Sequence, residues 1–179
     1  AAILTCACLC AGSCTSIPTA TRRSLGEAAV AVPDSGVRVA LVVGNGAYKS
    51  APHLRNPPRD ARAMGEQLRA LGFETLLAID VSKAELEQQL HEFVRKVDRA
   101  DVALLFYAGH GLQVSGHNFF VPIDAHLQTE ADVPYETVDV ERAVAAMQSL
   151  ARVGVLLLDS CRDNPLANAM AASSSGRGL

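Results

Sequence analysis

The sequence has no excess of basic residues to offer a nucleic acid. Its 179 residues include 16 Lys and Arg against 19 Asp and Glu, a formal net charge of −3. Proteins that bind nucleic acids normally carry a basic face, so we set this class of partner aside. The sequence also lacks histidines at metal-ligand spacing, and no role is assigned to His53, His91, His117 or His126.

Cysteine is scarce beyond the opening run AAILTCACLCAGSC, which holds four of the five cysteines and leaves Cys161 alone in the rest of the chain. A thiolate metal site is one interpretation of this run, but it has no nearby histidine. The run is too short to span a bilayer as a helix and is typical of an export signal, with lipid-anchor cleavage before Cys14 as an alternative. We therefore expect residues 1–20 to be a truncated export signal and the protein to be periplasmic or extracellular. Without such a signal it would be cytoplasmic.

One domain is expected from the length and from the distribution of residue types. Residues 21–37 are rich in Ser, Thr, Ala, Pro and Gly, which predicts a linker, and residues 169–179 are small and polar, which predicts a flexible tail. The domain itself is predicted to span residues 38–168.

Apolar, β-branched runs alternate with helical periodicity along this domain. The expected strands are Arg38–Gly44, Phe73–Ile79, Asp101–Tyr107 and Arg152–Asp159. The expected helices begin near Pro58, after Ser82 with Glu85 as a capping box, and around Val140, Val144 and Met147. A small hairpin is predicted to turn at Ser115–Gly116, and the acidic stretch Ile123–Glu141 is predicted to be a solvated loop.

This alternation predicts an α/β fold with a mainly parallel sheet and helices on both faces. Ligands of such sheets bind beyond the carboxyl ends of the strands. His110 follows one predicted strand, between two glycines that should leave its imidazole uncrowded, and Cys161 follows another. A thiol has an ordinary pKa of about 8.5, and a neighbouring imidazole raises its reactive thiolate fraction. The pair is therefore suited to acyl transfer.

Two separated blocks, YAGHG and LLLDSCRDNP, follow the opening RVALVVGNGAYKSAPHLRNPPRDARAM and the short segment LRALGFE. Together they resemble the caspase-like cysteine peptidases, specifically the bacterial relatives of metacaspases, over roughly Arg38 to Pro165. The resemblance implies a three-layer caspase-like fold. It also implies a larger protein, because the family continues beyond the nucleophile into a smaller second portion that completes the substrate cleft.

The resemblance also implies roles for individual residues. Cys161 would be the nucleophile and His110 the general base or acid, and the backbone N–H groups of Gly111 and Cys161 would hold the oxyanion. Asp60 and Asp159 match the acids with which metacaspases bind Arg or Lys at P1, the substrate residue before the cleaved bond. Peptides or proteins with basic P1 residues are the expected substrates.

The sequence also gives expectations about cofactors, self-cleavage and two alternative functions. No cofactor is expected to be required. Some metacaspases use calcium, but no calcium-loop pattern appears in this sequence. Arg177 in the tail is a possible self-cleavage site. A non-catalytic interaction module of the same fold remains an alternative. A nucleotide-binding domain is a weaker one, because Lys49 stands where the third glycine of the dinucleotide motif would follow Gly44 and Gly46.

Overall fold

A five-stranded parallel sheet forms the centre of the molecule. The computed structural model describes residues 3–7, 36–114 and 116–160. The strands lie in the order β1-β8-β4-β2-β3, and every neighbouring pair is parallel. Their bounds are β1 Ile3–Ala7, β2 Arg38–Gly44, β3 Glu74–Ile79, β4 Val102–Ala108 and β8 Val153–Asp159. The predicted α/β fold with a mainly parallel sheet is therefore confirmed.

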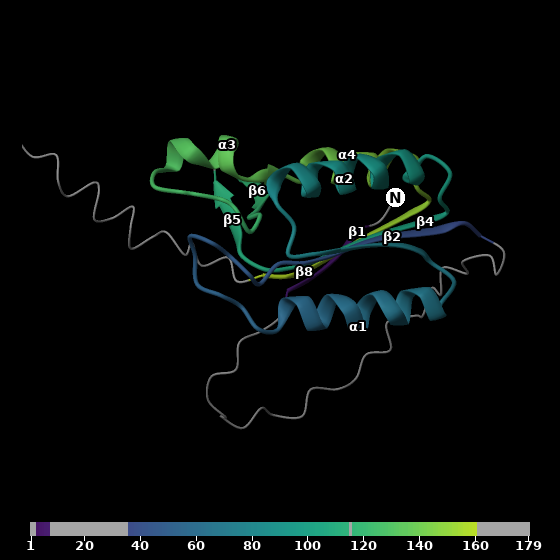
Figure 1. The fold of residues 1–179 in the computed structure, drawn as a ribbon. Coiled ribbons are helices and arrows are strands. Elements are labelled where there is room, and N and C mark those ends of the chain that lie inside the picture. The colour runs from purple at the N-terminus through teal and green to yellow at the C-terminus, as the bar shows by residue number, and fades with distance from the viewer. Residues whose placement is uncertain (1–2, 8–35, 115, 161–179) are drawn as a thin grey trace, which may run out of the picture.

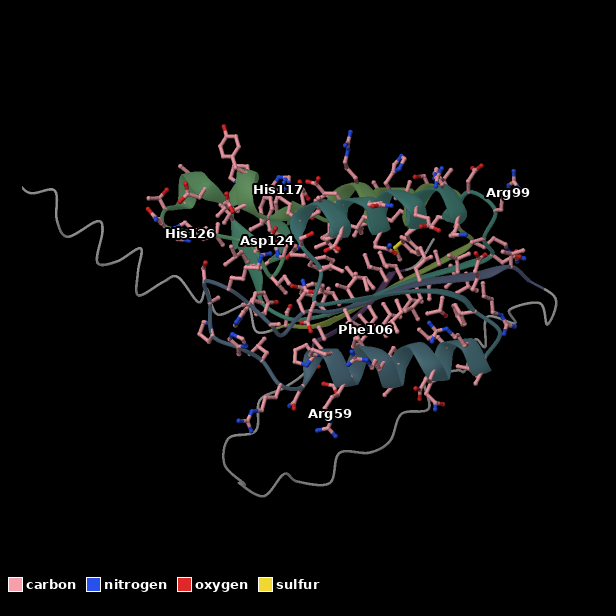
Figure 2. The ribbon with its side chains drawn as sticks, viewed as in Figure 1. Arg59, Arg99, Phe106, His117, Asp124 and His126 are labelled. Carbon is pink, nitrogen blue, oxygen red and sulfur yellow. The ribbon has the colours of Figure 1, made fainter. Side chains whose placement is uncertain are left out.

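Helices cover both faces of this sheet (Figure 1). The helix α1 (Pro57–Ala70) packs on one face, and α2 (Lys83–Val97) and α4 (Glu141–Leu150) pack side by side on the other. Side chains alternate between the two faces along a strand. Thus Phe106 lies toward α1 with Leu68 (Figure 2), whereas its neighbour Leu105 packs with Phe93 and Met147 on the other face. All of β4 is buried, which explains its continuous apolar run.

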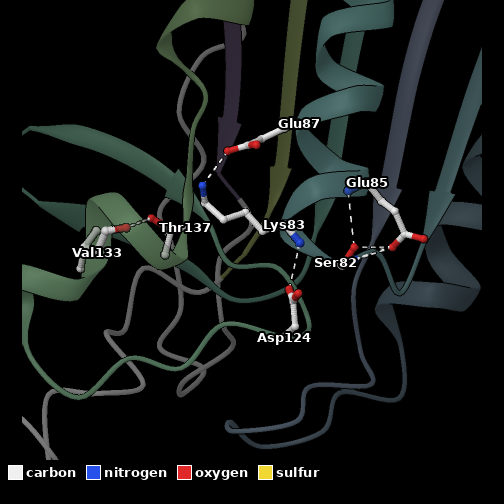
Figure 3. Close-up of polar contacts among 7 residues, drawn as sticks. All are labelled: Ser82, Lys83, Glu85, Glu87, Asp124, Val133 and Thr137. Carbon is white, nitrogen blue, oxygen red and sulfur yellow. Dashed lines mark hydrogen bonds and ion pairs between the residues drawn. The ribbon is translucent and has the colours of Figure 1, made fainter.

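The start of α2 confirms the predicted capping box. The Ser82 hydroxyl accepts a hydrogen bond from the backbone N–H of Glu85, and the Glu85 carboxylate accepts one from the backbone N–H of Ser82 (Figure 3). The Asp124 carboxylate accepts a further bond from the Lys83 N–H at 2.9 Å. These bonds satisfy N–H groups that a helix start otherwise leaves unpaired, and they fix α2 to the segment that holds Asp124.

A small antiparallel sheet follows β4 directly. It contains β5 (Gly111–Val114), β6 (His117–Phe120) and β7 (Val138–Asp139), and its first two strands are the predicted hairpin. The predicted solvated loop over Ile123–Glu141 is wrong, because this segment holds a 3-10 turn η1 (Glu130–Asp132), the short helix α3 (Val133–Glu136) and β7.

The acidic residues that suggested a solvated loop form local hydrogen bonds around a buried apolar set. Val133 is 2% exposed and Val138 is 6% exposed. The Asp132 carboxylate accepts hydrogen bonds from the N–H groups of Gln128 and Thr129. Counting charges missed these small elements because an Asp side chain at a turn can bond the backbone instead of facing solvent.

The strand β1 lies at the edge of the parallel sheet and is not predicted by the sequence analysis. Its residues Ile3–Ala7 pair with Gly154–Leu158 of β8. The segment belongs to the run interpreted as an export signal, and that interpretation stays a prediction. Within the described ranges, no helix has the length and apolar character needed to cross a bilayer.

Candidate active site

The carboxyl ends of β4 and β8 bring the two predicted catalytic positions to one edge of the sheet. Ala108 of β4 pairs with Asp159 of β8, and the Gly109 N–H donates to the Asp159 carbonyl at 3.4 Å. His110 and Cys161 each stand two residues beyond this pair in the sequence. The structure describes His110, whereas Cys161 and Arg177 lie outside the described residues.

Two tyrosines hold the backbone of His110. The His110 N–H donates to the Tyr48 hydroxyl oxygen at 2.7 Å, and the Tyr107 hydroxyl donates to the His110 carbonyl at 2.5 Å. Tyr107 belongs to β4, whereas Tyr48 comes from the loop between β2 and α1. Both peptide groups of His110 are therefore fixed by buried side chains.

Burial keeps both of these phenols neutral. It raises the pKa of Tyr48 above its ordinary value of 10.0, and it raises the pKa of Tyr107 well above that value, with the neighbouring Tyr48 adding to the effect. A neutral hydroxyl can accept one hydrogen bond and donate another. Both contacts to His110 are therefore maintained across the physiological pH range.

The two tyrosine hydroxyl groups leave no room for a side chain at position 109, so glycine is required there. Its φ is +152°, and a Cβ there would lie 2.6 Å from the Tyr48 oxygen and 2.9 Å from the Tyr107 oxygen. The Tyr48 ring also packs against the imidazole of His110, with centroids 4.5 Å apart. The prediction of an uncrowded imidazole is therefore wrong on this side. On the other side Gly111 approaches Ser160, the residue before Cys161, and a Cβ would lie 3.2 Å from its hydroxyl oxygen.

Among the residues that the structure describes, the imidazole makes one polar contact, between Nε2 of His110 and the carbonyl of Pro52 at 2.9 Å. A carbonyl oxygen accepts hydrogen bonds and has no proton to donate, so Nε2 carries the hydrogen. In the neutral ring the lone pair is then on Nδ1. The contact therefore leaves Nδ1 as the nitrogen that can receive a proton.

Asp159 and Asp60 both lie at this edge of the sheet. Asp159 is the last residue of β8, and Asp60 is in the first turn of α1, which packs on the end of β2 at Gly44. Both side chains are exposed, and neither makes a hydrogen bond or ion pair with any residue that the structure describes. Both carboxylates are thus available to a cationic ligand.

The glycines after β2 have a packing role. A Cβ on Gly44 would overlap the Pro57 carbonyl and the Ala61 methyl, and a Cβ on Gly46 would overlap the Leu54 carbonyl. The loop folds back on itself through a bond from the Leu54 N–H to the Gly46 carbonyl at 3.0 Å. These contacts explain the glycines without a bound phosphate.

A group of possible metal ligands lies in the small antiparallel sheet and at the start of α4. One ligand atom each of His117, Asp139 and Glu141 lies within 4.8 Å of the others. Figure 2 places His117 and His126 on the side that carries the small sheet, across the parallel sheet from Arg59. The Asp139 carboxylate already accepts the Glu141 N–H at 2.8 Å, and His117 is exposed. Such a His with two carboxylates suits a transition metal more than calcium, whose ligands are oxygens.

The caspase-domain family model matches residues 37–177. The chain belongs to the caspase-domain family. This is a family of cysteine peptidases, so the resemblance to caspase-like peptidases is confirmed. The caspase domain is also 33% identical over 129 residues to human mucosa-associated lymphoid tissue lymphoma translocation protein 1, and equally to its mouse homolog. Each match covers 70% of this chain, which spans about 15% of the length of these relatives.

Several residues around His110 were missed by the sequence analysis. Tyr48 and Pro52 lie in a segment without periodicity, and nothing in their spacing relates them to a histidine more than 50 residues away. The Asn45 amide and the Asp80 carboxylate, which hold this loop, were missed for the same reason. Only the position of each directly after a predicted strand could have pointed to Asn45 and Asp80.

Proposed function

We propose that the chain is a cysteine-type endopeptidase in which Cys161 attacks a peptide carbonyl and His110 accepts the thiol proton. The observation that carries this proposal is the pairing of Ala108 with Asp159. Neighbouring strands in register place the residues that follow them side by side at one edge of the sheet. The approach of Gly111 to Ser160 supports the same arrangement.

Because Nε2 of His110 carries the hydrogen, Nδ1 is the nitrogen that transfers protons in each step of the proposed reaction. Nδ1 takes the proton of Cys161, and the thiolate attacks the substrate carbonyl carbon. The backbone N–H groups of Gly111 and Cys161 stabilise the resulting oxyanion, and each such donor contributes roughly 3 to 4 kcal/mol to lowering the barrier. Nδ1 then returns its proton to the leaving amine. Water, deprotonated by the same nitrogen, hydrolyses the acyl-enzyme and restores the thiol.

We propose further that Asp60 and Asp159 select Arg or Lys at P1. Asp159 ends β8, and Asp60 lies in the first turn of α1, which packs on the end of β2. Both carboxylates are therefore at the carboxyl edge of the sheet, where the substrate is expected to bind. Exposed carboxylates without protein partners favour a cation and repel an acidic P1 side chain.

Labelling with an arginyl chloromethylketone tests the reaction. We expect one adduct on Cys161, detected by intact mass and peptide mapping, and a loss of labelling of about 100-fold or more in His110→Ala. The control is His91→Ala, since His91 is exposed on α2 and makes no polar contact with the described residues. Equal labelling of wild type and His110→Ala would instead favour a non-catalytic caspase-fold interaction module.

The substrate pocket is tested by a pair of charge-neutralising variants. Asp60→Asn and Asp159→Asn should each raise KM for an arginyl peptide about tenfold, because a hydrogen bond to a charged group contributes about 1.5 to 3 kcal/mol. A peptide with Asp at P1 should remain a poor substrate of the wild type. Unchanged KM in both variants would contradict the pocket.

Several further features of the protein remain proposals. Export would remove β1 from β8 if cleavage followed residue 20, and the amino-terminal sequence of the secreted protein tests this. Self-cleavage after Arg177 is tested by incubating active protein and Cys161→Ala in parallel. Calcium dependence is tested by adding a chelator, and the proposed mechanism requires no metal. Oligomeric state and any second portion of the polypeptide are tested with the full-length protein.

A further inference from the structure

The loop between β2 and α1 holds His110 at two separate points. Tyr48 accepts the His110 N–H at 2.7 Å, and four residues later the Pro52 carbonyl accepts Nε2–H at 2.9 Å. The loop spans residues 45–56 and contains no helix or strand. Segments of this kind are usually the more mobile parts of a fold. The orientation of the imidazole therefore depends on whatever keeps this loop in place.

Asp80 attaches the loop to the end of β3. A single carboxylate oxygen of Asp80 accepts the Gly46 N–H at 2.7 Å and the Ala47 N–H at 2.9 Å. The N–H of Asp80 itself donates to the Gly44 carbonyl at 3.0 Å. Two bonds thus connect Asp80 to the first residues of the loop, just before Tyr48, and a third connects it to the end of β2.

The backbone of Asp80 is strained. Its φ is +52°, which no other non-glycine residue shows among those that the structure describes. A side chain in this region costs roughly 1 kcal/mol, although Asp tolerates it better than most residues. A strained conformation persists where surrounding bonds determine it, and here the two bonds from the loop do so.

Asn45 continues the attachment inside the protein. Its side chain is fully buried, its oxygen accepts the Val81 N–H at 3.1 Å, and its NH₂ donates to the Val121 carbonyl at 3.2 Å. The hydroxyl hydrogen of Tyr107, which bonds the His110 carbonyl at 2.5 Å, is shared with the Val121 carbonyl at 3.2 Å. A series of hydrogen bonds therefore leads from the residues after β3, through Asn45 and Tyr107, to His110.

We propose that Asp80 and Tyr48 are positioning residues that fix the ring orientation and the tautomer of His110 through the loop. Among its contacts with the described residues, the Asp80 carboxylate bonds the loop and not the imidazole, so it acts by holding the segment that carries Tyr48 and Pro52. Its effect on catalysis rests on the proposed peptidase function. Its effect on the imidazole does not, because the Nε2 contact exists without a substrate.

The expected consequence of releasing the loop is a change in the protonated nitrogen. With Pro52 in place, the neutral ring carries its hydrogen on Nε2. When the loop moves away, Nε2 loses its acceptor and the hydrogen divides between the two nitrogens. Fewer molecules then present the Nδ1 lone pair, and the ring is also free to rotate away.

The test is ¹⁵N NMR of the histidine rings in the full chain, assigned to His110 with His110→Gln. In the neutral ring of the wild type, Nε2 should be protonated and Nδ1 unprotonated. Asp80→Gly should shift both signals toward a mixture of tautomers. Glycine adopts the same φ without strain, so the variant removes the carboxylate while the backbone can keep its course.

Two matched variants separate positioning from general loosening of the fold. Asp80→Asn retains an acceptor oxygen and tolerates positive φ, so it should keep the wild-type ring signals. Asp132→Ala removes a carboxylate that, like Asp80, accepts two backbone N–H groups, from Gln128 and Thr129, in a loop that does not contact His110. It should lower stability and leave the ring signals unchanged.

Tyr48 is tested by Tyr48→Phe, which keeps the ring against the imidazole and removes the acceptor oxygen. We expect hydrogen exchange of the His110 amide to accelerate about tenfold or more, because a bonded N–H loses its partner. Tyr135→Phe is the control, since Tyr135 is 77% exposed. Unchanged exchange in Tyr48→Phe would overturn its role.

The two proposals fail in different ways. Ring signals that stay unchanged in Asp80→Gly overturn the positioning role, whatever the enzyme does. If the signals shift as expected but Cys161→Ala leaves peptide cleavage intact, the peptidase mechanism fails and the positioning of His110 stands. If both proposals hold, Asp80→Gly should slow labelling of Cys161 about tenfold or more, and Asp80→Asn should restore it.

Discussion

The two ends of the parallel sheet are held by different kinds of contact. At the carboxyl end, buried or half-buried hydrogen bonds of Tyr48 and Tyr107 hold His110, and a buried bond joins Asn45 of the loop after β2 to Val121. At the amino end, the contacts are exposed or half-exposed, such as Lys96 with Glu74 at 2.5 Å and Asp101 with Arg152 at 3.7 Å. Buried polar bonds are costly to leave unmade, whereas exposed ion pairs contribute little.

This difference indicates where the sheet can support a precise arrangement of side chains. A buried hydroxyl has few alternative partners, so it fixes the group that it bonds. An exposed ammonium group exchanges its carboxylate for water at small cost. The chemistry proposed for His110 therefore coincides with the end at which the polar groups are buried, and substitutions at the two ends should differ accordingly.

The largest difference is expected between two glycines with positive φ. Gly109→Ala brings a methyl group against both tyrosine hydroxyls, and we expect a loss of about 2 to 4 kcal/mol and at least about 100-fold slower labelling of Cys161. Gly72→Ala, at the amino end, meets no atom closer than 4.0 Å and should cost about 1 kcal/mol with labelling unchanged. Urea unfolding and labelling rates measure both. Equal losses would show that the two ends are alike.

A smaller difference is expected between two polar side chains. Asn45→Ala leaves the buried Val81 N–H without its acceptor and should cost about 3 kcal/mol. Asp101→Ala removes the half-exposed acceptor of the Val37 N–H, which water can replace, and should cost about 1 kcal/mol or less. Thermal unfolding of the two variants makes the comparison, and a larger loss in Asp101→Ala would reverse it.

The next smaller effect is expected in an alkaline titration, which should distinguish the buried Tyr48 and Tyr107 from the exposed Tyr135. Because burial raises the pKa of Tyr48 and Tyr107, the unfolded chain loses their protons first as the pH rises. The stability that depends on these neutral phenols is present below pH 10 and falls above it. We expect phenolate absorbance from these two residues to appear only together with unfolding. Reversible ionisation of all three tyrosines in the folded protein would contradict their burial.

The smallest effect is expected for the ion pair at the amino end. The hydrogen bond to Glu74 raises the pKa of Lys96, so its contribution to stability is present below the ordinary lysine pKa of 10.5 and is lost as the pH rises through the folded value. Lys96→Met should lower the unfolding midpoint slightly at low salt, and this difference should vanish at high salt. A loss that persists at high salt would show that packing of the lysine stem, rather than charge, holds this end.

Patterns in the sequence determined the elements and their order. The run Arg38–Gly44 is β2 as predicted, and Ser82 with Glu85 begins α2 as predicted, because hydrophobic period and capping are local properties. Local reasoning failed at Ile123–Glu141, where acidic side chains bond the backbone around buried Val133 and Val138. It also gave no sign that Ile3–Ala7 would pair with β8, since sheet pairing depends on a partner distant in the sequence.

The sequence by itself determined that a histidine and a cysteine would follow strands of one parallel sheet. Only the tertiary structure decided what surrounds the histidine: which nitrogen faces Pro52, which hydroxyls hold its peptide groups, and which carboxylate holds the loop. Those contacts join residues 3 to 76 positions apart. A hydrogen bond needs its atoms within about 3 Å of each other, and only the packed sheet brings them that close.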